Sequence, residues 1–188
     1  TNYVFDPMTT ETLAIPQGVI PTVTEVFTGS ALNSLASVAS GTNALTFTAA
    51  AGVTYRIAVA GQSGAQGLIM LEVVGPPRNS TLATAIALNL GNTESGTNRN
   101  ALPEPGEPAH AGQPAAASIW YKWTSNLTGR VVFTTRGSSF DTLAAVYSGP
   151  ASSPTFASLV PVASNDNEVG LTTSRVEFNA IAGTTYRI

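Results

Sequence analysis

Short stretches in which apolar and polar residues alternate run along most of the chain and predict β-strands. The clearest lie in a block that occurs twice, LTFTAAAGVTYRI at 45–57 and VEFNAIAGTTYRI at 176–188, identical at eight of thirteen aligned positions. Because apolar residues alternate on both sides of an Ala51-Gly52 turn, the block is predicted to be a β-hairpin. Its core-facing residues are expected to be Phe47, Tyr55, Ile57 and Val59, and its solvent-facing residues Thr46, Thr48, Thr54 and Arg56.

The repeat indicates two copies of one domain, offset by 131 residues (176 − 45 = 131). Shorter matches support it, since EVFTGS at 25–30 resembles AVYSGP at 145–150. The segment GPPRNS at 75–80 contains consecutive prolines, which a central strand does not tolerate, so the domain boundary is placed there. Residues 1–75 are therefore interpreted as the C-terminal part of a first β-sandwich repeat, and 76–188 as a second repeat lacking its last strands.

No window shows a sustained helical periodicity, so the predicted fold class is all-β with antiparallel sheets. The segment at 82–88 fits either a short helix or a strand, and 100–114 is too rich in Pro and Gly for regular structure. The other strands are expected at 3–5, 23–27, 35–39, 67–74, 118–124, 129–136, 142–149, 159–164 and 174–181. The expected core of the second repeat is Ile119, Tyr121, Trp123, Val131, Phe133, Leu143, Val146, Tyr147, Val176 and Phe178, with Val131 and Phe133 buried together.

Composition narrows the class of protein. Charged residues make up 10% of the chain and hydrophobic residues 43%, a profile typical of an extracellular all-β protein with hydroxyl-rich strands. The chain has no Cys, which excludes disulfides and thiolate metal sites. A net charge of −3 argues against nucleic acid as a partner, and no apolar run is long enough to span a membrane. The chain is expected to be secreted or displayed at a cell surface.

Three motifs of the second copy resemble the bacterial pre-peptidase C-terminal domain: SSFDTLAAVYSG at 138–149, VASNDNE at 162–168 and SRVEFNAIAGTTYRI at 174–188. The resemblance covers most of 78–188 and, more weakly, 20–74. It implies tandem jelly-roll-like β-sandwiches, secretion, and no catalysis by the domain itself. The sequence departs from the pattern in RNSTLATA at 78–85, in an NDN turn where NDD is usual, and in the absence of that turn from the first copy.

A cluster of oxygen-bearing side chains follows the strand at 159–164. Calcium requires about six to eight oxygen ligands, and the family pairing would bring Asp141 close to this turn. Asn and Asp also simply favour turns, so a calcium site and a plain turn both remain open. The candidate metal ligands are Asp141, Asn165, Asp166, Asn167 and Glu168.

Other candidates lie around the Pro-rich loop. Glu104, Glu107 and His110 could ligate a metal, but they offer only three side chains, fewer than a calcium site needs. The favoured interpretation is a rigid Pro-braced loop that covers Trp120 or Trp123, with His110 hydrogen-bonded to backbone. In IWYKWT, Trp120 and Trp123 point to opposite strand faces, so at least one should point away from the main core and is a candidate for stacking on a ligand. NST at 79–81 and NLT at 126–128 match the glycosylation sequon, which leaves modification of Asn79 or Asn126 open.

No Ser is framed by a nucleophile-elbow motif, and no carboxylate pair is placed for glycoside cleavage, so the chain is not expected to be an enzyme. The leading hypothesis is a structural repeat module of a surface array or extracellular filament. Because the second copy stops at Ile188, it is expected to be completed by a following repeat or by a strand from an identical subunit. The alternative is an accessory module that binds carbohydrate or a fibrous protein for a secreted hydrolase.

Overall fold

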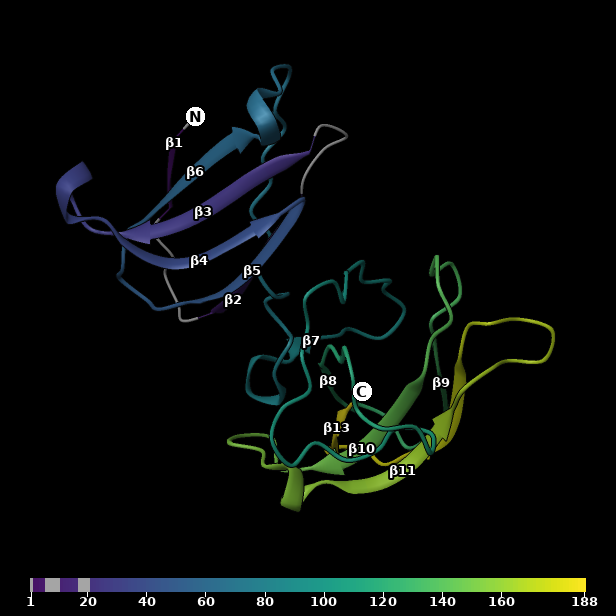
Figure 1. The fold of residues 1–188 in the computed structure, drawn as a ribbon. Helices are drawn as coiled ribbons and strands as arrows, with labels where there is room; N and C mark the ends of the chain where they lie inside the picture. Colours follow the sequence, from purple (N-terminus) through teal and green to yellow (C-terminus); the bar gives the residue numbers. More distant parts are fainter. Residues whose placement is uncertain (1, 6–10, 17–20) are drawn as a thin grey trace. The chain divides into compact units, whose positions relative to one another are not determined.

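The computed structural model describes residues 2–5, 11–16 and 21–188, with side chains described from residue 21 onward. The chain is β-rich: its described residues form several small sheets, and helical structure there is limited to single 3-10 turns (Figure 1). These turns are η1 (Leu32–Ser34), η2 (Gln62–Gly64), η3 (Leu82–Thr84) and η4 (Phe156–Ser158).

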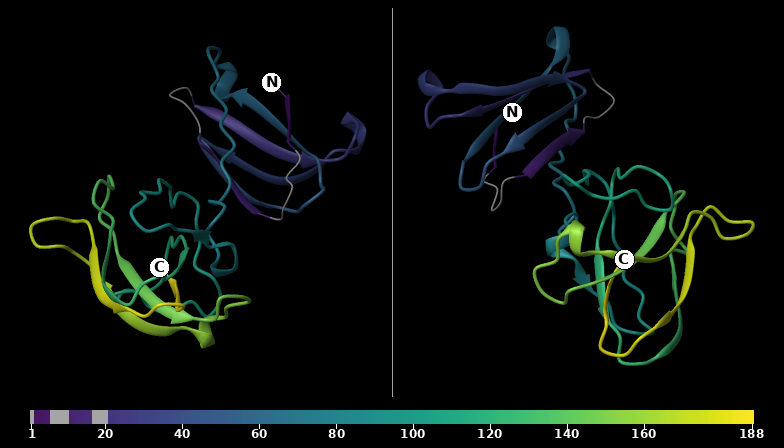
Figure 2. Two further views of the ribbon diagram at one scale, coloured as in Figure 1. Left: turned by 180° about the vertical axis from the view of Figure 1, so that it is seen from behind. Right: turned by 90° about the horizontal axis from the view of Figure 1, so that it is seen from below.

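The chain divides into two compact units, Thr1–Pro76 and Pro77–Ile188. In the first unit, one sheet has the strand order β1-β6-β3-β4 and a second pairs β2 with β5. Two further views show these sheets from behind and from below (Figure 2). The strands are β1 (Asn2–Phe5), β2 (Glu11–Pro16), β3 (Thr22–Thr28), β4 (Ala36–Thr42), β5 (Ala44–Ala49) and β6 (Tyr55–Gly61).

In the second unit, the larger sheet has the order β11-β10-β13-β8-β7 and the smaller pairs β12 with β9. All of these pairs are antiparallel except β7 with β8, which is parallel. The strands are β7 (Ile86–Ala87), β8 (Tyr121–Thr124), β9 (Gly129–Thr134), β10 (Ala144–Gly149), β11 (Val160–Asn165), β12 (Arg175–Ala180) and β13 (Thr185–Arg187).

The strands of the two units pair in the same way. The pairs β1–β6, β2–β5, β3–β4 and β3–β6 have their counterparts in β8–β13, β9–β12, β10–β11 and β10–β13. Even the irregularity recurs, because β3 is bulged between Val26 and Phe27 and β10 between Val146 and Tyr147. Corresponding residues lie 120 positions apart at the bulge (146 − 26 = 120).

The twice-occurring block is not a hairpin, which corrects the prediction from its alternation. β5 pairs with β2 while β6 pairs with β1 and β3, so the turn between them carries the chain from one sheet to another. The same holds for β12 and β13. Gly52 and Gly183 sit in these turns with φ of 72° and 80°, a conformation that glycine adopts without strain. Alternation shows which side chains point inward, but it does not show which strand is the hydrogen-bonding neighbour.

Each unit has its own apolar core. In the first, Phe47, Tyr55, Ile57 and Val59 are buried as predicted. The segment 67–74 was expected to be a strand, but residues 65–73 have no regular secondary structure. The side chains of Ile69, Leu71 and Val73, which alternate along this segment, nevertheless pack against this core.

In the second unit, Val131 is buried and Phe133 is half-buried against the same core, which confirms the predicted register of β9. Leu143 is a wrong prediction: it is 41% exposed, because its neighbours Thr142 and Ala144 are the inward-facing residues. Ile119 and Tyr121 are only half-buried. The core comprises Trp123, Val131, Ala144, Val146, Val176, Phe178, Ala180 and Tyr186.

Candidate functional site

The second unit has a further buried layer, separate from its core, on the other face of the five-stranded sheet. Trp123 lies in the core, whereas Trp120, three positions earlier, packs with Leu82, Ala85 and Tyr147. The rings of Trp120 and Tyr147 have centroids 6.2 Å apart. Phe156 packs half-buried against the same layer, with its ring centroid 5.8 Å from that of Trp120. We call this group the outer layer.

The Pro-rich loop at 100–114 is held to the outer layer by a chain of hydrogen bonds. A carboxylate oxygen of Glu104 accepts the backbone N–H of Leu82 at 2.6 Å. The carboxylate of Glu107 accepts the N–H of Glu104 at 2.8 Å and contacts Nε2 of His110 at 2.9 Å. His110 Nδ1 lies 2.8 Å from the hydroxyl of Tyr147. The side chain of Glu107 is only 1% exposed, so these bonds are the means by which its carboxylate is accommodated.

This arrangement supports the interpretation of the loop as a brace. His110 was expected to bond to backbone atoms; its main chain does bridge to Gln113, but its ring bonds to two side chains. The hydroxyl of Tyr147 can donate either to His110 Nδ1 or to the carbonyl of Ala109, 3.3 Å away. Because a carboxylate only accepts, Nε2 carries the hydrogen of the contact with Glu107, and Nδ1 can accept from the hydroxyl of Tyr147. Burial, together with the charge of Glu107, raises the pKa of the Tyr147 phenol above its ordinary value.

Both tryptophans proposed as ligand-binding residues are buried. Trp120 is 2% exposed beneath the loop, edge-on to His110 at 5.5 Å, and Trp123 is 4% exposed and stacked on Tyr186 at 5.8 Å. Trp120 does point away from the main core, as strand alternation predicted, but the Pro-rich loop covers it. Neither indole offers an open face for stacking on a ligand, which corrects the expectation of an aromatic platform.

The proposed calcium ligands are only partly brought together. Asp141 and Asp166 line one shallow open depression with Gln113 and Leu143. Asn165 instead turns its side-chain oxygen to the N–H of Arg175 at 3.0 Å, and Asn167 is exposed. Among the described residues, no group of three or more His, Cys, Asp or Glu side chains is arranged to hold a metal ion.

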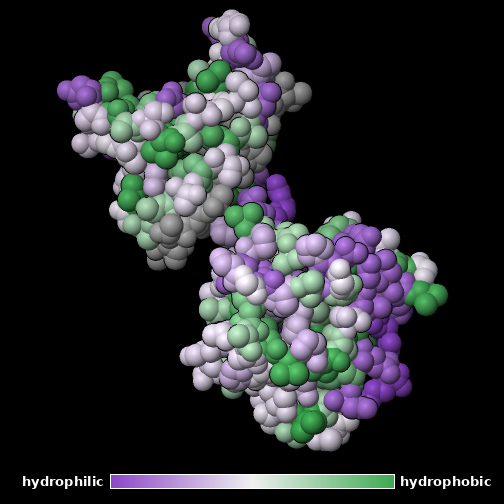
Figure 3. All heavy atoms as spheres, turned by 60° about the horizontal axis from the view of Figure 1, so that its bottom comes forward, coloured by the Kyte–Doolittle hydropathy of each residue, from purple (hydrophilic) through white to green (hydrophobic). Residues whose placement is uncertain are grey.

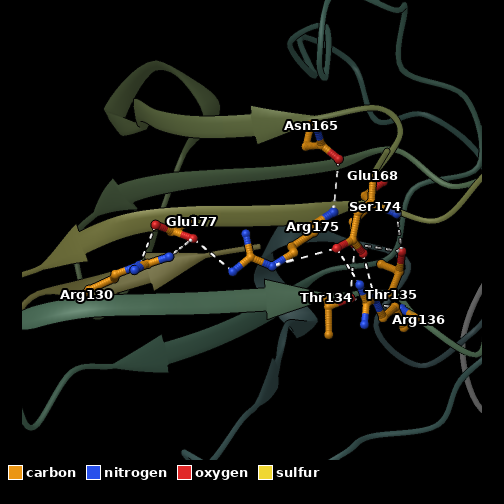
Figure 4. Close-up of polar contacts among 9 residues, drawn as sticks. All are labelled: Arg130, Thr134, Thr135, Arg136, Asn165, Glu168, Ser174, Arg175 and Glu177. Atoms are coloured by element: carbon orange, nitrogen blue, oxygen red, sulfur yellow. Dashed lines mark hydrogen bonds and ion pairs between the residues drawn. The ribbon is translucent and has the colours of Figure 1, made fainter. Parts of the chain in front are cut away.

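Glu168 departs furthest from the calcium expectation, because it belongs to a ladder of alternating charges (Figure 4). Arg136 binds both of its carboxylate oxygens, at 2.6 and 2.5 Å. Arg175 lies 3.9 Å from Glu168 and 2.9 Å from Glu177, and Arg130 donates to Glu177 at 2.7 Å. These pairs connect β9, β12 and the turn after β11. The neighbouring arginines lower the pKa of both glutamates. Figure 3 shows hydrophilic side chains gathered along one side of the second unit.

A buried hydroxyl cluster fixes the same turn, and the sequence reading missed it. Ser174 is fully buried, and its Oγ donates to the carbonyls of Thr142 and Asp166, the latter at 2.7 Å. Its N–H donates to Thr135 Oγ1 at 2.8 Å, and the hydroxyls of Thr135 and Thr142 lie 2.5 Å apart. Hydroxyl-rich segments are common in this chain, so only the tertiary contacts distinguish these three residues from other Ser and Thr.

An arginine anchors a loop at the same place in both units. Arg56 was expected to face solvent, but it is half-buried and its Nη1 donates to the carbonyl of Gly29, directly after β3. Arg187 is 2% exposed, and its Nη2 donates to the carbonyls of Pro150 and Ala151, at 3.1 and 3.2 Å, directly after β10. Burial lowers the pKa of Arg187. Each arginine fixes the loop that follows a bulged strand.

The two glycosylation sequons differ in accessibility. Asn79 is 4% exposed; its side-chain amide donates to the carbonyl of Trp120 at 3.1 Å and its own carbonyl accepts the N–H of Trp120 at 2.7 Å. Asn126 is exposed in the turn between β8 and β9. Of the two sequon asparagines, Asn126 is the one that presents its side chain to solvent in the folded chain.

Comparison with known proteins gives no match: no family model, no curated protein and no solved structure is similar to this chain. Within the part of the chain that the structure describes, no helix is long and apolar enough to cross a membrane.

Proposed function

We propose that this chain is a non-catalytic structural module of a secreted or cell-surface protein, built from two jelly-roll-like β-sandwiches in tandem. The proposal rests on the features that the two units share, because these features are structural. Both units have the same strand pairs, the same bulge, a tyrosine bonded to the turn before it, and an arginine bonded to the loop after the bulged strand. All of these features support the scaffold, as expected where selection preserves shape.

The acid–base side chains of the second unit support the same proposal, because they are used to hold a loop. Glu107, His110 and Tyr147 use their polar atoms on one another and on the backbone of the loop. Their network fixes a covering loop and is itself covered. The binding-module alternative depended on an exposed tryptophan, and the burial of Trp120 and Trp123 leaves it without an observation in its favour.

We propose neighbouring repeats or identical subunits as the partners, with strand donation as the mode of contact. The first unit illustrates how such completion works, since a non-strand segment containing Ile69, Leu71 and Val73 packs on its core. A sandwich that lacked such a segment would gain about 1.5–3 kcal/mol for each apolar side chain that a neighbour supplied.

Two measurements on the same preparation test the proposal. Light scattering over a wide concentration range should show association of copies, or of this chain with a longer chain carrying the next repeat. Screening against glycans and fibrous collagen should show no saturable binding. A strictly monomeric chain that neither self-associates nor binds a longer chain would refute the assembly role. Saturable glycan or collagen binding would favour the accessory-module alternative instead.

A further inference from the structure

Three buried nitrogen atoms in the second unit have no hydrogen-bond acceptor: Nε1 of Trp120, and Nε and Nη1 of Arg187. Both residues are 2% exposed. All three atoms carry hydrogens and can only donate. An unsatisfied buried donor is costly, and a buried guanidinium without a compensating acceptor is more so.

Strand register places these donors in one neighbourhood. Arg187 on β13 lies directly opposite Tyr147 on β10 and Lys122 on β8. Trp120 precedes Lys122 by two residues, so it lies on the same sheet face as a diagonal neighbour of Arg187. Diagonal neighbours are about 7–8 Å apart, within reach of long side chains. Trp120 and Tyr147 both belong to the outer layer.

The two carboxylates nearest the outer layer, Glu104 and Glu107 of the covering loop, already accept hydrogen bonds from other groups. Glu107 uses one carboxylate oxygen for His110 and the other for the N–H of Glu104, while Glu104 accepts from Leu82. The two carbonyls that Arg187 does reach, those of Pro150 and Ala151, both bind Nη2. The lowered pKa of Arg187 has burial as its cause. The three N–H donors of Arg187 and Trp120 are therefore left without an acceptor in this layer.

Among the side chains that the structure describes, unsatisfied buried donors are found in the second unit and not in the first. Its equivalent arginine, Arg56, makes the same kind of bond to a loop carbonyl but is half-buried, so water can reach its guanidinium. Arg187 is enclosed, and the neighbouring Trp120 adds a further free donor. A water molecule would bring donors of its own into a place that already has too many, whereas an anion only accepts.

We propose that a small monovalent anion of the chloride class binds beneath the loop at 100–114, held by the guanidinium of Arg187 and the indole N–H of Trp120. The anion would offset the positive charge of the buried Arg187 guanidinium and accept hydrogen bonds from the free N–H groups of both residues. Its binding would stabilise the second unit by mass action, because the unfolded chain presents no such enclosure.

Crystals of the unaltered chain grown or soaked in bromide give the direct test. Bromide scatters anomalously, so an anomalous peak within hydrogen-bond distance of Arg187 Nε or Nη1 and Trp120 Nε1 is the expected result. A water molecule at that position, side chains packed without space for an ion, or bromide found only at the protein surface would overturn the proposal.

Thermal unfolding at constant ionic strength supplies a solution test, with sodium gluconate replaced stepwise by sodium chloride. At a chloride concentration about ten times the dissociation constant, the Tm of the second unit should rise by about 5 °C. Trp120→Phe keeps an aromatic ring and removes one donor, and it should raise the half-saturating chloride concentration by about tenfold or more. Arg187→Met should abolish the dependence.

Arg56→Met is the matched control, because it removes the equivalent anchor from the first unit and should leave the chloride dependence of the second unchanged. Should Arg187→Met fail to fold, Trp120→Phe and the bromide experiment still decide the question. A Tm that is independent of chloride in the unaltered chain, or equally dependent in Trp120→Phe, would contradict the site.

Discussion

The hydroxyl of Tyr186 accepts a hydrogen bond from the backbone N–H of Ile181 at 3.0 Å, five residues upstream. In the first unit, Tyr55 accepts the N–H of Ala50 at 2.9 Å in the same way. Each bond spans the turn that carries the chain from one sheet to another, while the ring of the tyrosine is buried in the core. This tyrosine corner fixes the angle between two strands that do not pair.

We predict that Tyr186→Phe destabilises the second unit by about 1 kcal/mol, because the ring still fills the core but the N–H of Ile181 loses its acceptor. Tyr55→Phe should do the same to the first unit. Urea denaturation measures both, followed by tryptophan fluorescence for the second unit, which contains Trp120 and Trp123, and by circular dichroism for the first. Tyr121→Phe is the control and should change stability by less than about 0.5 kcal/mol. Equal effects of all three substitutions would show that the corner bond has no special role.

Glu107→Leu should destabilise the second unit by about 1–3 kcal/mol, because the N–H of Glu104 and Nε2 of His110 would lose their partner beneath the loop. Hydrogen exchange at 100–114 should accelerate with it. Glu94→Leu, at an exposed position before the loop, is the matched control. A Glu107 variant as stable as the control would mean that the network does not hold the loop.

The phenol of Tyr147 should ionise at higher pH than free tyrosine, because burial and the charge of Glu107 raise its pKa. A folded-state pKa above the unfolded value of 10.0 means that the unfolded chain releases this proton first. The contribution to stability is therefore present below about pH 10 and is lost as the pH rises further. Absorbance titration near 295 nm, compared with Tyr147→Phe, measures the shift. In Glu107→Leu the phenol should titrate at lower pH.

The charge ladder should make the second unit sensitive to acid. The arginines lower the pKa of Glu168 and Glu177 below the ordinary 4.5, so their contribution to stability is present above that pH and is lost as the pH falls through the folded values. Urea midpoints between pH 6 and 3 should decline less in the double variant Glu168→Gln, Glu177→Gln. High salt should reduce the difference, because these side chains are near the surface. If the urea midpoints of the unaltered chain and the double variant fall equally with pH at low salt, the ladder contributes nothing to stability.

Calcium should change the Tm of the second unit by less than about 1 °C at 2 mM, because the turn supplies few of the six to eight oxygens required. Asp141 and Asp166 share one open depression, whereas Arg136 and Arg175 already neutralise Glu168. Calorimetry with calcium or chelator measures the effect, with Asp166→Asn as the comparison. A clear rise in Tm that Asp166→Asn removes would establish a calcium site despite this geometry.

The repeated block illustrates how far sequence alone could predict the fold. Alternation correctly identified the buried faces of Phe47, Tyr55 and Ile57, because a side-chain period of two follows from the geometry of any extended strand. It predicted the wrong partner for each strand. A hairpin and a turn between two sheets have the same inward-facing residues, and they differ only in which strand supplies the backbone hydrogen bonds.

The candidate sites show the same contrast between what the local sequence predicts and what tertiary packing decides. The sequence by itself determined that Trp120 and Trp123 face opposite ways and that Glu107 and His110 share one loop, because both follow from local spacing. Only the tertiary structure decided that the loop covers Trp120, that Arg187 is enclosed while Arg56 is not, and that Glu168 binds arginine. Burial and charge pairing depend on distant segments: Glu168 pairs with an arginine 32 residues away, and Arg187 bonds to a carbonyl 37 residues away. Their side chains meet only when the sheets pack, so no local pattern encodes them.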